Sequence, residues 1–351
     1  MKYAIILAGG SGSRFWPLSR RSRPKQFLRV CSKRPMITEA LERAASLVGV
    51  GNVYLAANAL QKNGGRGYLR GLGVKEENIF LEPHAKNTFA PIAFLTSKIY
   101  SRDKDAVIAV LPCDHFIKGS ALFRRAALRA FSVAERGYIV TMGIRPLRPE
   151  TGYGYIKRGR RLRGILGGSC FKVERFIEKP PLETARKFCR DKKYYWNSGM
   201  FIFKADVMLR EIKRILPQAY RLLARINNYE DVKKAWAGFG SFSIDCGIME
   251  KTSRAAVLPS DYRWTDLGSW LAMREVMSCD RNGNVLRGNC LDIGSRNVLV
   301  WAGKRLIATL GLKDIIVVDS DDALLVCHKD NTQDVRKLTQ LLKRRKLEKY
   351  L

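Results

Sequence analysis

The chain has 351 residues, a formal net charge of +32 and 46% hydrophobic residues. This length predicts more than one domain, and the hydrophobic content is sufficient for a globular core. No apolar run approaches the roughly 20 residues of a transmembrane helix. The short apolar N-terminus leads directly into glycines, which is not the pattern of a secretory leader. We therefore expect no membrane partner and a cytoplasmic location.

The positive charge is not confined to a tail. Residues 280–351 carry a net charge of +5, so +27 belongs to residues 1–279. Such a field attracts polyanions, and non-specific binding of nucleic acid is one possible result. The eight cysteines contain no C-x-x-C pair, which favours reduced thiols. Three histidines without paired spacing argue against a zinc site.

Strands and helices are predicted to alternate through the first 150 residues. Apolar runs predict strands, and amphipathic or apolar segments between them predict helices. The expected strands are 2–8, 52–58, 106–114 and 137–144, and the expected helices lie near 36–47, 91–100 and 121–135. This alternation is typical of a doubly wound, mainly parallel α/β sheet, in which ligands bind at the carboxyl ends of the strands.

The pattern changes twice after residue 150. Segments 151–157 and 170–180 predict two strands around a basic, glycine-containing loop, 158–168. After residue 280, short β-like runs follow one another, and a final amphipathic helix is expected over 335–350. We predict a larger domain over 1–280 and a small β domain over 281–351.

A glycine-rich loop follows the first predicted strand. Its sequence, LAGGSGSRFWPLSRRSRPKQ, lacks the third glycine and the later acid of a dinucleotide loop. It also lacks the Gly-Lys-Ser/Thr of a P-loop. Two interpretations remain: backbone amides that bind a triphosphate, or a tight turn with a solvated basic face. The arginines at 20, 21 and 23 are indistinguishable from ordinary surface charge.

A longer set of motifs resembles the sugar-1-phosphate nucleotidyltransferase family. In chain order, the motifs are LAGGSGSRFWPLS with RPKQF, EPHAKNTFAPIA, LPCDHFI, TGYGYI, RFIEKP, YWNSGMFIF, FSIDCGIMEK and WTDLGSW, which together span residues 7–270. The WNSGMF, FSID and WTDLGSW motifs are most similar to the branch that acts on mannose 1-phosphate, the mannose-1-phosphate guanylyltransferases.

The resemblance implies a Rossmann-like nucleotidyltransferase domain followed by a small left-handed β-helix-like domain, and a homodimer. It implies Mg²⁺-dependent transfer of GMP from GTP to α-D-mannose 1-phosphate, with formation of GDP-mannose and pyrophosphate. GDP-mannose is a nucleotide sugar used in polysaccharide biosynthesis. The attacking phosphate is already anionic at neutral pH, because the second pKa of a phosphate monoester is about 6. Cations and a metal ion are therefore required more than a general base is.

Matching motif by motif assigns the expected site residues. Arg14 and Lys25 are the expected catalytic cations, and Asp114 and Asp266 are the expected Mg²⁺ ligands. The expected nucleotide-binding residues are Leu7, Gly9, Gly10, Ser11, Gly12, Glu82, Pro83, Asn87 and Thr88. The expected sugar-phosphate-binding residues are Gly154, Glu178, Lys179, Asn197 and Asp245.

Three positions depart from the family pattern. Lys86 stands where arginine is common, Phe89 where alanine is common, and Cys246-Gly247 where tyrosine-alanine is common. One alternative is therefore a nucleotidyltransferase for another hexose 1-phosphate or another nucleotide. A second alternative is a nucleic-acid-binding protein on an inactive transferase fold, which the net charge and the basic loop suggest.

Overall fold

The computed structural model describes all residues except 11, 31, 59–70, 165–168 and 227–228. The described chain forms two compact units. The sheet unit comprises Met1–Gly9, Ala40–Cys113 and Ile117–Trp264. The coil unit comprises Gly10–Glu39, Asp114–Phe116 and Thr265–Leu351. No described helix has both the length and the apolarity needed to cross a membrane.

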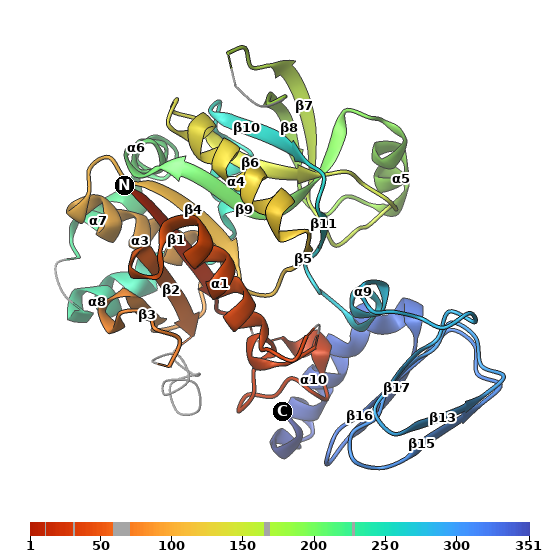
Figure 1. The fold of residues 1–351 in the computed structure, drawn as a ribbon. Helices are drawn as coiled ribbons and strands as arrows, with labels where there is room; N and C mark the ends of the chain where they lie inside the picture. Colours follow the sequence, from red (N-terminus) through yellow and green to blue (C-terminus); the bar gives the residue numbers. More distant parts are fainter. Residues whose placement is uncertain (11, 31, 59–70, 165–168, 227–228) are drawn as a thin grey trace. The chain divides into compact units, whose positions relative to one another are not determined.

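The sheet unit contains a nine-stranded sheet in the order β3-β2-β1-β4-β9-β6-β10-β8-β7 (Figure 1). The strands are β1 (Lys2–Ala8), β2 (Val53–Asn58), β3 (Ile79–Glu82), β4 (Val107–Pro112), β6 (Ile139–Ile144), β7 (Tyr155–Arg161), β8 (Phe171–Ile177), β9 (Tyr194–Lys204) and β10 (Ala255–Ser260). Strands β1 to β4 pair in parallel, as do β6 and β10, whereas β9 is antiparallel to both β4 and β6. The sheet is therefore mainly parallel with an antiparallel insertion.

The described helices that belong wholly or partly to this unit are α1 (Met36–Val48), α3 (Phe89–Arg102), α4 (Ser120–Ala134), α5 (Leu182–Arg190), α6 (Ala205–Ile215), α7 (Pro217–Ala224) and α8 (Tyr229–Gly238). Alternate residues of β1 and β4, such as Ile5 and Val110, share a buried cluster with side chains of α3 and α6. The side chains of a strand alternate between the two faces of its sheet, so this cluster marks one covered face. Helix α4 packs against β4, β6, β9 and β10 (Figure 1).

The coil unit contains the β-helix-like part of the chain. Its strands are β12 (Val285–Arg287), β13 (Cys290–Ile293), β14 (Leu299–Trp301), β15 (Ile307–Leu310), β16 (Ile315–Asp319) and β17 (Leu324–His328). Strands β12, β14 and β16 pair in parallel in one sheet, and β13 pairs in parallel with β15 in another. Strands β12 to β16 thus alternate between two sheets, which confirms the expected β-helix-like domain, and β17 closes the first sheet antiparallel to β16.

The helices α9 (Trp270–Val276) and α10 (Val335–Arg344) also belong to this unit. The last helix is shorter than the expected 335–350. The residues after the first glycines also belong here: Phe15, Trp16 and Leu28 share a buried cluster with Trp270, Trp301 and Val335. The compact units thus group the chain differently from the predicted division at residue 280, which stays a prediction. Short strands β5 (Phe116–Lys118) and β11 (Arg263–Thr265) contain two of the points where the chain passes from one unit to the other.

Candidate active site

Gly12 begins the basic loop, and two features require glycine there. Its φ angle is +64°, in the left-handed region that favours glycine. An added Cβ would lie 2.4 Å from Cβ of Lys25 and 2.7 Å from Oγ of Ser19. The single turn Ser13–Phe15 follows at once, closed by a hydrogen bond from Phe15 N to Gly12 O of 2.8 Å. The glycine therefore lets the backbone approach Lys25 closely.

Lys25 is a buried cation with defined partners. Its side chain is 8% exposed, and its ammonium lies 3.0 Å from Oδ2 of Asp114. The same ammonium donates to the main-chain oxygen of Asp266 at 3.3 Å and lies 4.9 Å from the ring centre of Phe15. A buried lysine requires compensation by a carboxylate and hydrogen bonds. One predicted catalytic residue thus contacts both predicted metal-binding residues.

The pKa of the Asp114 carboxyl reflects two opposing effects. Burial raises this pKa, but the charges of Lys25 and His115 and the hydrogen bond from Lys25 lower it more. The net pKa is below the ordinary value of 3.8, so Asp114 is ionised at neutral pH. His115 is itself buried. Asp114 therefore provides anionic oxygen at the end of the β4 segment.

Asp266 lies in a tight turn before α9. Its Oδ1 accepts a hydrogen bond of 2.7 Å from Gly268 N. A Cβ on Gly268 would lie 2.8 Å from the Asp266 carboxylate, so a larger residue there would displace that carboxylate. The Gly268 carbonyl in turn accepts a bond of 3.3 Å from the Arg14 guanidinium. Sequence reasoning did not find this role of Gly268, because a main-chain acceptor leaves no residue-type signal.

Asp114 and Asp266 provide oxygen ligands of the kind that Mg²⁺ prefers. Both residues contact the one Lys25 ammonium, which brings them into a common neighbourhood within the coil unit. Among the described residues, no group of three or more His, Cys, Asp or Glu side chains is arranged to hold a metal. The two residues fit an ion that also takes phosphate and water ligands.

The prediction that the arginines at 20, 21 and 23 are all ordinary surface charge is wrong for Arg20. Its side chain is only 13% exposed and lies 2.6 Å from Oδ1 of Asp322. The guanidinium also donates to Ser320 Oγ at 3.2 Å, to Pro17 O at 2.7 Å and to Tyr350 O. Arg21 and Arg23 are exposed, as expected. The sequence could not distinguish these arginines, because Ser320 and Asp322, the side-chain partners of Arg20, are about 300 residues away.

Other expected nucleotide-binding residues lie in the sheet unit. Glu82, at the end of β3, is 4% exposed, and burial raises the pKa of its carboxyl to about 7 although a backbone hydrogen bond from Lys86 opposes this. A Cβ on Gly9 would lie 3.0 Å from Glu82 Oε1. Leu7, in β1, accepts a hydrogen bond from Cys113 N. Gly10, by contrast, belongs to the coil unit, and a Cβ added to it would meet nothing within 4 Å.

The rest of this segment forms a turn before α3. Pro83 is partly buried, and Asn87 is exposed with φ of +61°. The side-chain oxygen of Asn87 accepts from Thr88 N at 2.9 Å. The Thr88 hydroxyl accepts from Ile244 N at 3.0 Å. Ser11 lies outside the described residues.

Four expected sugar-binding residues come together in the sheet unit. A Cβ on Gly154 would lie 2.6 Å from Glu178 Oε2, and Gly154 O accepts from Asn197 N at 2.8 Å. Asn197 Nδ2 donates to Asp245 Oδ1 at 2.7 Å. Lys179, with φ of +46°, lies 3.0 Å from Glu178 but is mostly exposed.

The Asp245 carboxyl has a raised pKa. Burial is the larger cause, the negative charge of Glu178 adds to it, and the pKa reaches about 6. Thr141, in β6, donates to Asn197 Oδ1 at 3.0 Å and so fixes the amide with its nitrogen toward Asp245. Sequence reasoning missed Thr141, because a polar residue inside a predicted buried strand has no local signal of its partner.

Two family models match the chain. A model described as nucleotidyl transferase matches residues 3–283, and one described as MannoseP isomerase/GMP-like beta-helix domain matches residues 288–342. The chain is 40% identical to xanthan biosynthesis protein XanB of Xanthomonas campestris pv. campestris, with 97% of this chain and 73% of the relative covered.

A second relative and a solved structure are also similar to nearly the whole chain. The chain is 38% identical to mannose-1-phosphate guanylyltransferase of Escherichia coli K12, again over 97% of this chain and 73% of the relative. A structure from Thermus thermophilus, described as a mannose-1-phosphate geranyltransferase, is 34% identical, with a TM-score of 0.89 over 97% of this chain and 99% of that one.

Proposed function

The chain belongs to the nucleotidyl transferase family, and we propose that it transfers GMP from GTP to α-D-mannose 1-phosphate, with release of pyrophosphate. The observation that carries this proposal is the Lys25 ammonium, which contacts the Asp114 carboxylate and the Asp266 carbonyl while Arg14 binds the next turn. This arrangement places positive charge and carboxylate oxygens in one small region. Phosphoryl and nucleotidyl transfers require this combination.

The chemistry assigns different tasks to the residues of the coil unit. The phosphate of mannose 1-phosphate is largely a dianion at neutral pH, so it attacks the α-phosphorus without a general base. Lys25 reduces the repulsion between the two anionic substrates, and Arg14 stabilises the charge that develops on pyrophosphate. Asp114 and Asp266 would hold Mg²⁺, which when bound neutralises phosphate charge.

Glu82 with Pro83 and Asn87 is assigned to the nucleobase, whereas Thr88 of the same segment is bonded to Ile244 N. A carboxyl with a pKa of about 7 can accept or donate a hydrogen bond near neutral pH, and guanine presents both kinds of partner. Lys86 occupies the position where the family commonly has arginine, but its ammonium is already bonded. It donates to Ala237 O at 3.1 Å and to Phe239 O at 2.8 Å.

Gly154, Glu178, Asn197 and Asp245 are assigned to the mannose hydroxyls, and Lys179 to the sugar phosphate. The supporting observation is that Asn197 and Asp245 form a hydrogen-bonded pair beside Glu178. Paired amide and carboxylate groups give both donors and acceptors, which hydroxyl recognition needs. Another hexose 1-phosphate remains the alternative substrate.

Pyrophosphate release from GTP and mannose 1-phosphate tests this function. Wild type is compared with Asp266→Asn and with the matched control Asp321→Asn, whose aspartate is 78% exposed. We expect turnover in wild type and the control, and a loss of at least about 100-fold in Asp266→Asn. A panel of four nucleotides and several hexose 1-phosphates completes the experiment. Turnover of another pair in preference to GTP and mannose 1-phosphate would contradict the assignment.

The homodimer is also part of this proposal, and the supporting surface lies in the coil unit. Leu291 and Ile293 of β13 are 56% and 62% exposed, and Leu310 of β15, which pairs with Ile293, is 74% exposed. Adjacent exposed leucine and isoleucine side chains on one face are typical of a surface that is covered in an assembly. We assign a second copy of this chain as the partner.

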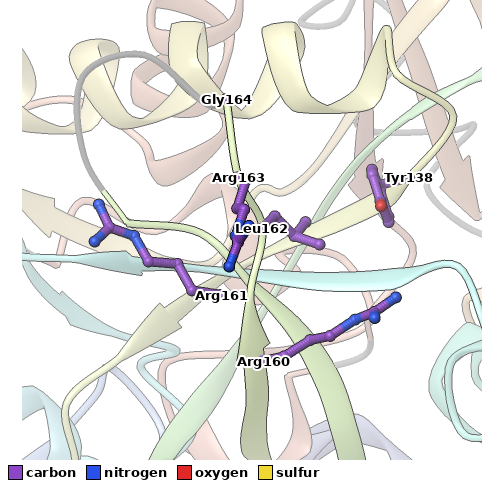
Figure 2. A pocket seen from close by; sticks show the side chains of 6 residues that line it. All are labelled: Tyr138, Arg160, Arg161, Leu162, Arg163 and Gly164. Carbon is purple, nitrogen blue, oxygen red and sulfur yellow. The ribbon is translucent and has the colours of Figure 1, made fainter.

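Polyanion binding is a second candidate function, favoured by a basic hollow of about 900 Å³ in the sheet unit. Arg160, Arg161 and Arg163 line it together with Tyr138, and Figure 2 shows the three arginines spread around the end of β7. Within the described residues, none of these three arginines forms an ion pair with a carboxylate. Unpaired guanidinium groups bind phosphate readily.

Binding of a fluorescent single-stranded oligonucleotide at several salt concentrations tests this second function. The triple variant R160Q/R161Q/R163Q is expected to bind at least about tenfold more weakly and with a shallower salt dependence. The variant R124Q/R125Q/R186Q, at other exposed arginines, controls for net charge. Equal losses in the two variants would show that charge alone, rather than this hollow, attracts the oligonucleotide.

A further inference from the structure

The segment assigned to the nucleobase is bonded directly to the segment that carries Asp245. The Thr88 hydroxyl accepts a hydrogen bond of 3.0 Å from Ile244 N, and Phe89 N donates to Phe242 O at 3.3 Å. Ile244 is the residue immediately before the π-helical turn Asp245–Met249. These two bonds join segments that are about 155 positions apart in the sequence. They hold the backbone just before Asp245, the first residue of the turn.

An aromatic stack reinforces the same junction. The rings of Phe89 and Phe242 lie 4.9 Å apart with an interplanar angle of 24°, and Phe89 is 1% exposed. Added Cβ atoms on Gly240 and Gly247 would lie 2.3 and 2.6 Å from the Phe242 ring. The ring is therefore enclosed by two glycines and stacked on Phe89. Phe89 and Gly247, which both depart from the family pattern, are linked through this one ring.

The other side of Asp245 is fixed by Asn197. The amide of Asn197 donates to Asp245 Oδ1 at 2.7 Å, and its own oxygen accepts from Thr141 Oγ1 at 3.0 Å and Gly199 N at 3.1 Å. The amide cannot turn over without losing these bonds. The position of the Asp245 carboxylate therefore depends on two sets of contacts. Asn197 bonds to the carboxylate directly, and Thr88 and Phe89 bond to the backbone just before Asp245.

We propose that Thr88 and Phe89 are positioning residues for Asp245, so that the nucleobase segment sets the affinity for the sugar phosphate through the Ile244 amide and the Phe242 ring. This proposal rests on the proposed function, because it takes Asp245 as a ligand of the sugar hydroxyls. A positioning residue holds a substrate-binding side chain in place without touching the substrate itself. Loss of Thr88 or Phe89 therefore weakens sugar binding through Asp245 and leaves nucleotide binding unchanged. Thr88 then serves a substrate different from the one that its motif suggests.

Thr88→Val tests the hydrogen bond, because valine keeps the shape of threonine and removes the acceptor. Thr88→Ser restores the acceptor. Thr96→Val is the matched control: Thr96 is on the helix that follows Thr88, is fully buried, and its hydroxyl has no hydrogen-bond partner among the described residues. We expect the KM for mannose 1-phosphate, at saturating GTP, to rise about five- to tenfold in Thr88→Val only, as for loss of one partly buried hydrogen bond. The KM for GTP should stay within about twofold.

Gly247→Ala tests the aromatic contact separately, since the added methyl must displace the Phe242 ring. Gly51→Ala, where a Cβ meets nothing within 4 Å, is its control. We expect the same selective rise in the KM for mannose 1-phosphate. A rise confined to the KM for GTP in Thr88→Val would overturn the proposal, because Thr88 would then contact the nucleotide. Loss of thermal stability without a change in either KM would also overturn it.

Hydrogen–deuterium exchange of residues 242–250 without substrates separates this proposal from the proposed function. Thr88→Val and Gly247→Ala are expected to exchange faster than wild type in this segment, and both controls are expected to match wild type. If wild type failed to use mannose 1-phosphate while these differences appeared, the function would be wrong and the junction would stand. Unchanged exchange in both variants would overturn the junction itself.

Discussion

Gly12 and Lys25 are packed so closely that a single added methyl cannot fit between them. A Cβ on Gly12 would lie 2.4 Å from Cβ of Lys25, and the Lys25 ammonium is held 3.0 Å from Asp114. The glycine of the loop therefore has a steric role in placing the buried cation, in addition to any contact of its amide with phosphate. This relationship leads to the first two predictions.

Gly12→Ala is expected to reduce kcat by at least about 100-fold, because the methyl must displace Lys25 from Asp114. Gly294→Ala is the control: Gly294 also has a positive φ, of +72°, but a Cβ there meets nothing within 4 Å. The control therefore experiences the backbone strain without the steric conflict. Initial rates of pyrophosphate release measure both variants. Equal rates in Gly12→Ala and wild type would contradict the steric role.

Lys25→Met is expected to lower kcat by about 10²- to 10³-fold, the range for removal of one positioned donor to a developing charge. Because Lys25 also lowers the pKa of Asp114, that pKa should rise in the variant. NMR titration of the Asp114 carboxyl measures the pKa. An unshifted titration with intact activity would show that the pair is not maintained in solution.

Glu82→Gln is expected to change the pH dependence of stability. The folded-state pKa of about 7 exceeds the ordinary 4.5, so the folded protein keeps a proton that the unfolded chain loses between these values. The contribution of Glu82 to the free energy of unfolding of wild type therefore falls as pH rises from 4.5 to 7, by up to about 3 kcal/mol. The variant should lack this fall, and the exposed Glu135→Gln should retain it. Parallel pH profiles for Glu82→Gln and wild type, from urea denaturation, would refute the raised pKa.

Arg20→Ala is expected to destabilise the coil unit by about 2 kcal/mol, as for loss of charge-assisted hydrogen bonds from a largely buried side chain. Its partners include Asp322 and Ser320, far along the chain. Arg21→Ala, at an exposed arginine, should stay within about 0.5 kcal/mol of wild type. Thermal melting compares the three proteins. Similar melting temperatures for the two variants would mean that Arg20 is ordinary surface charge after all.

Ile293→Lys and Leu310→Lys are expected to convert a dimer to a monomer, because each would place a charge in the proposed apolar contact. Leu147→Lys, at a leucine that is 85% exposed in the sheet unit, is the control. Light scattering coupled to gel filtration gives the mass of each protein. A wild-type mass near the 39.8 kDa of one chain would rule out the dimer at the concentration used.

Much of the sheet unit could be predicted from local patterns. The expected strand over 2–8 and the expected helix over 36–47 are confirmed to within one residue, since apolar runs and helical periodicity depend on neighbouring residues. Strand β9 was not predicted, although it lies between β4 and β6. Its sequence, YYWNSGMFIFK, contains the WNSGMF motif, but nothing in it shows that its pairing is antiparallel to both neighbours.

The sequence by itself determined the family, the mainly parallel α/β class, the β-helix-like domain and the residue types of the candidate site. These follow from motifs and periodicities that are complete within short segments. Only the tertiary structure decided that Arg20 is bonded while Arg21 and Arg23 are exposed, that Lys25 lies between Asp114 and Asp266, and that Thr88 is bonded to Ile244. Each of these relationships joins residues about 90 to 300 positions apart. Such contacts depend on how the whole chain packs, and no local pattern of residue types encodes them.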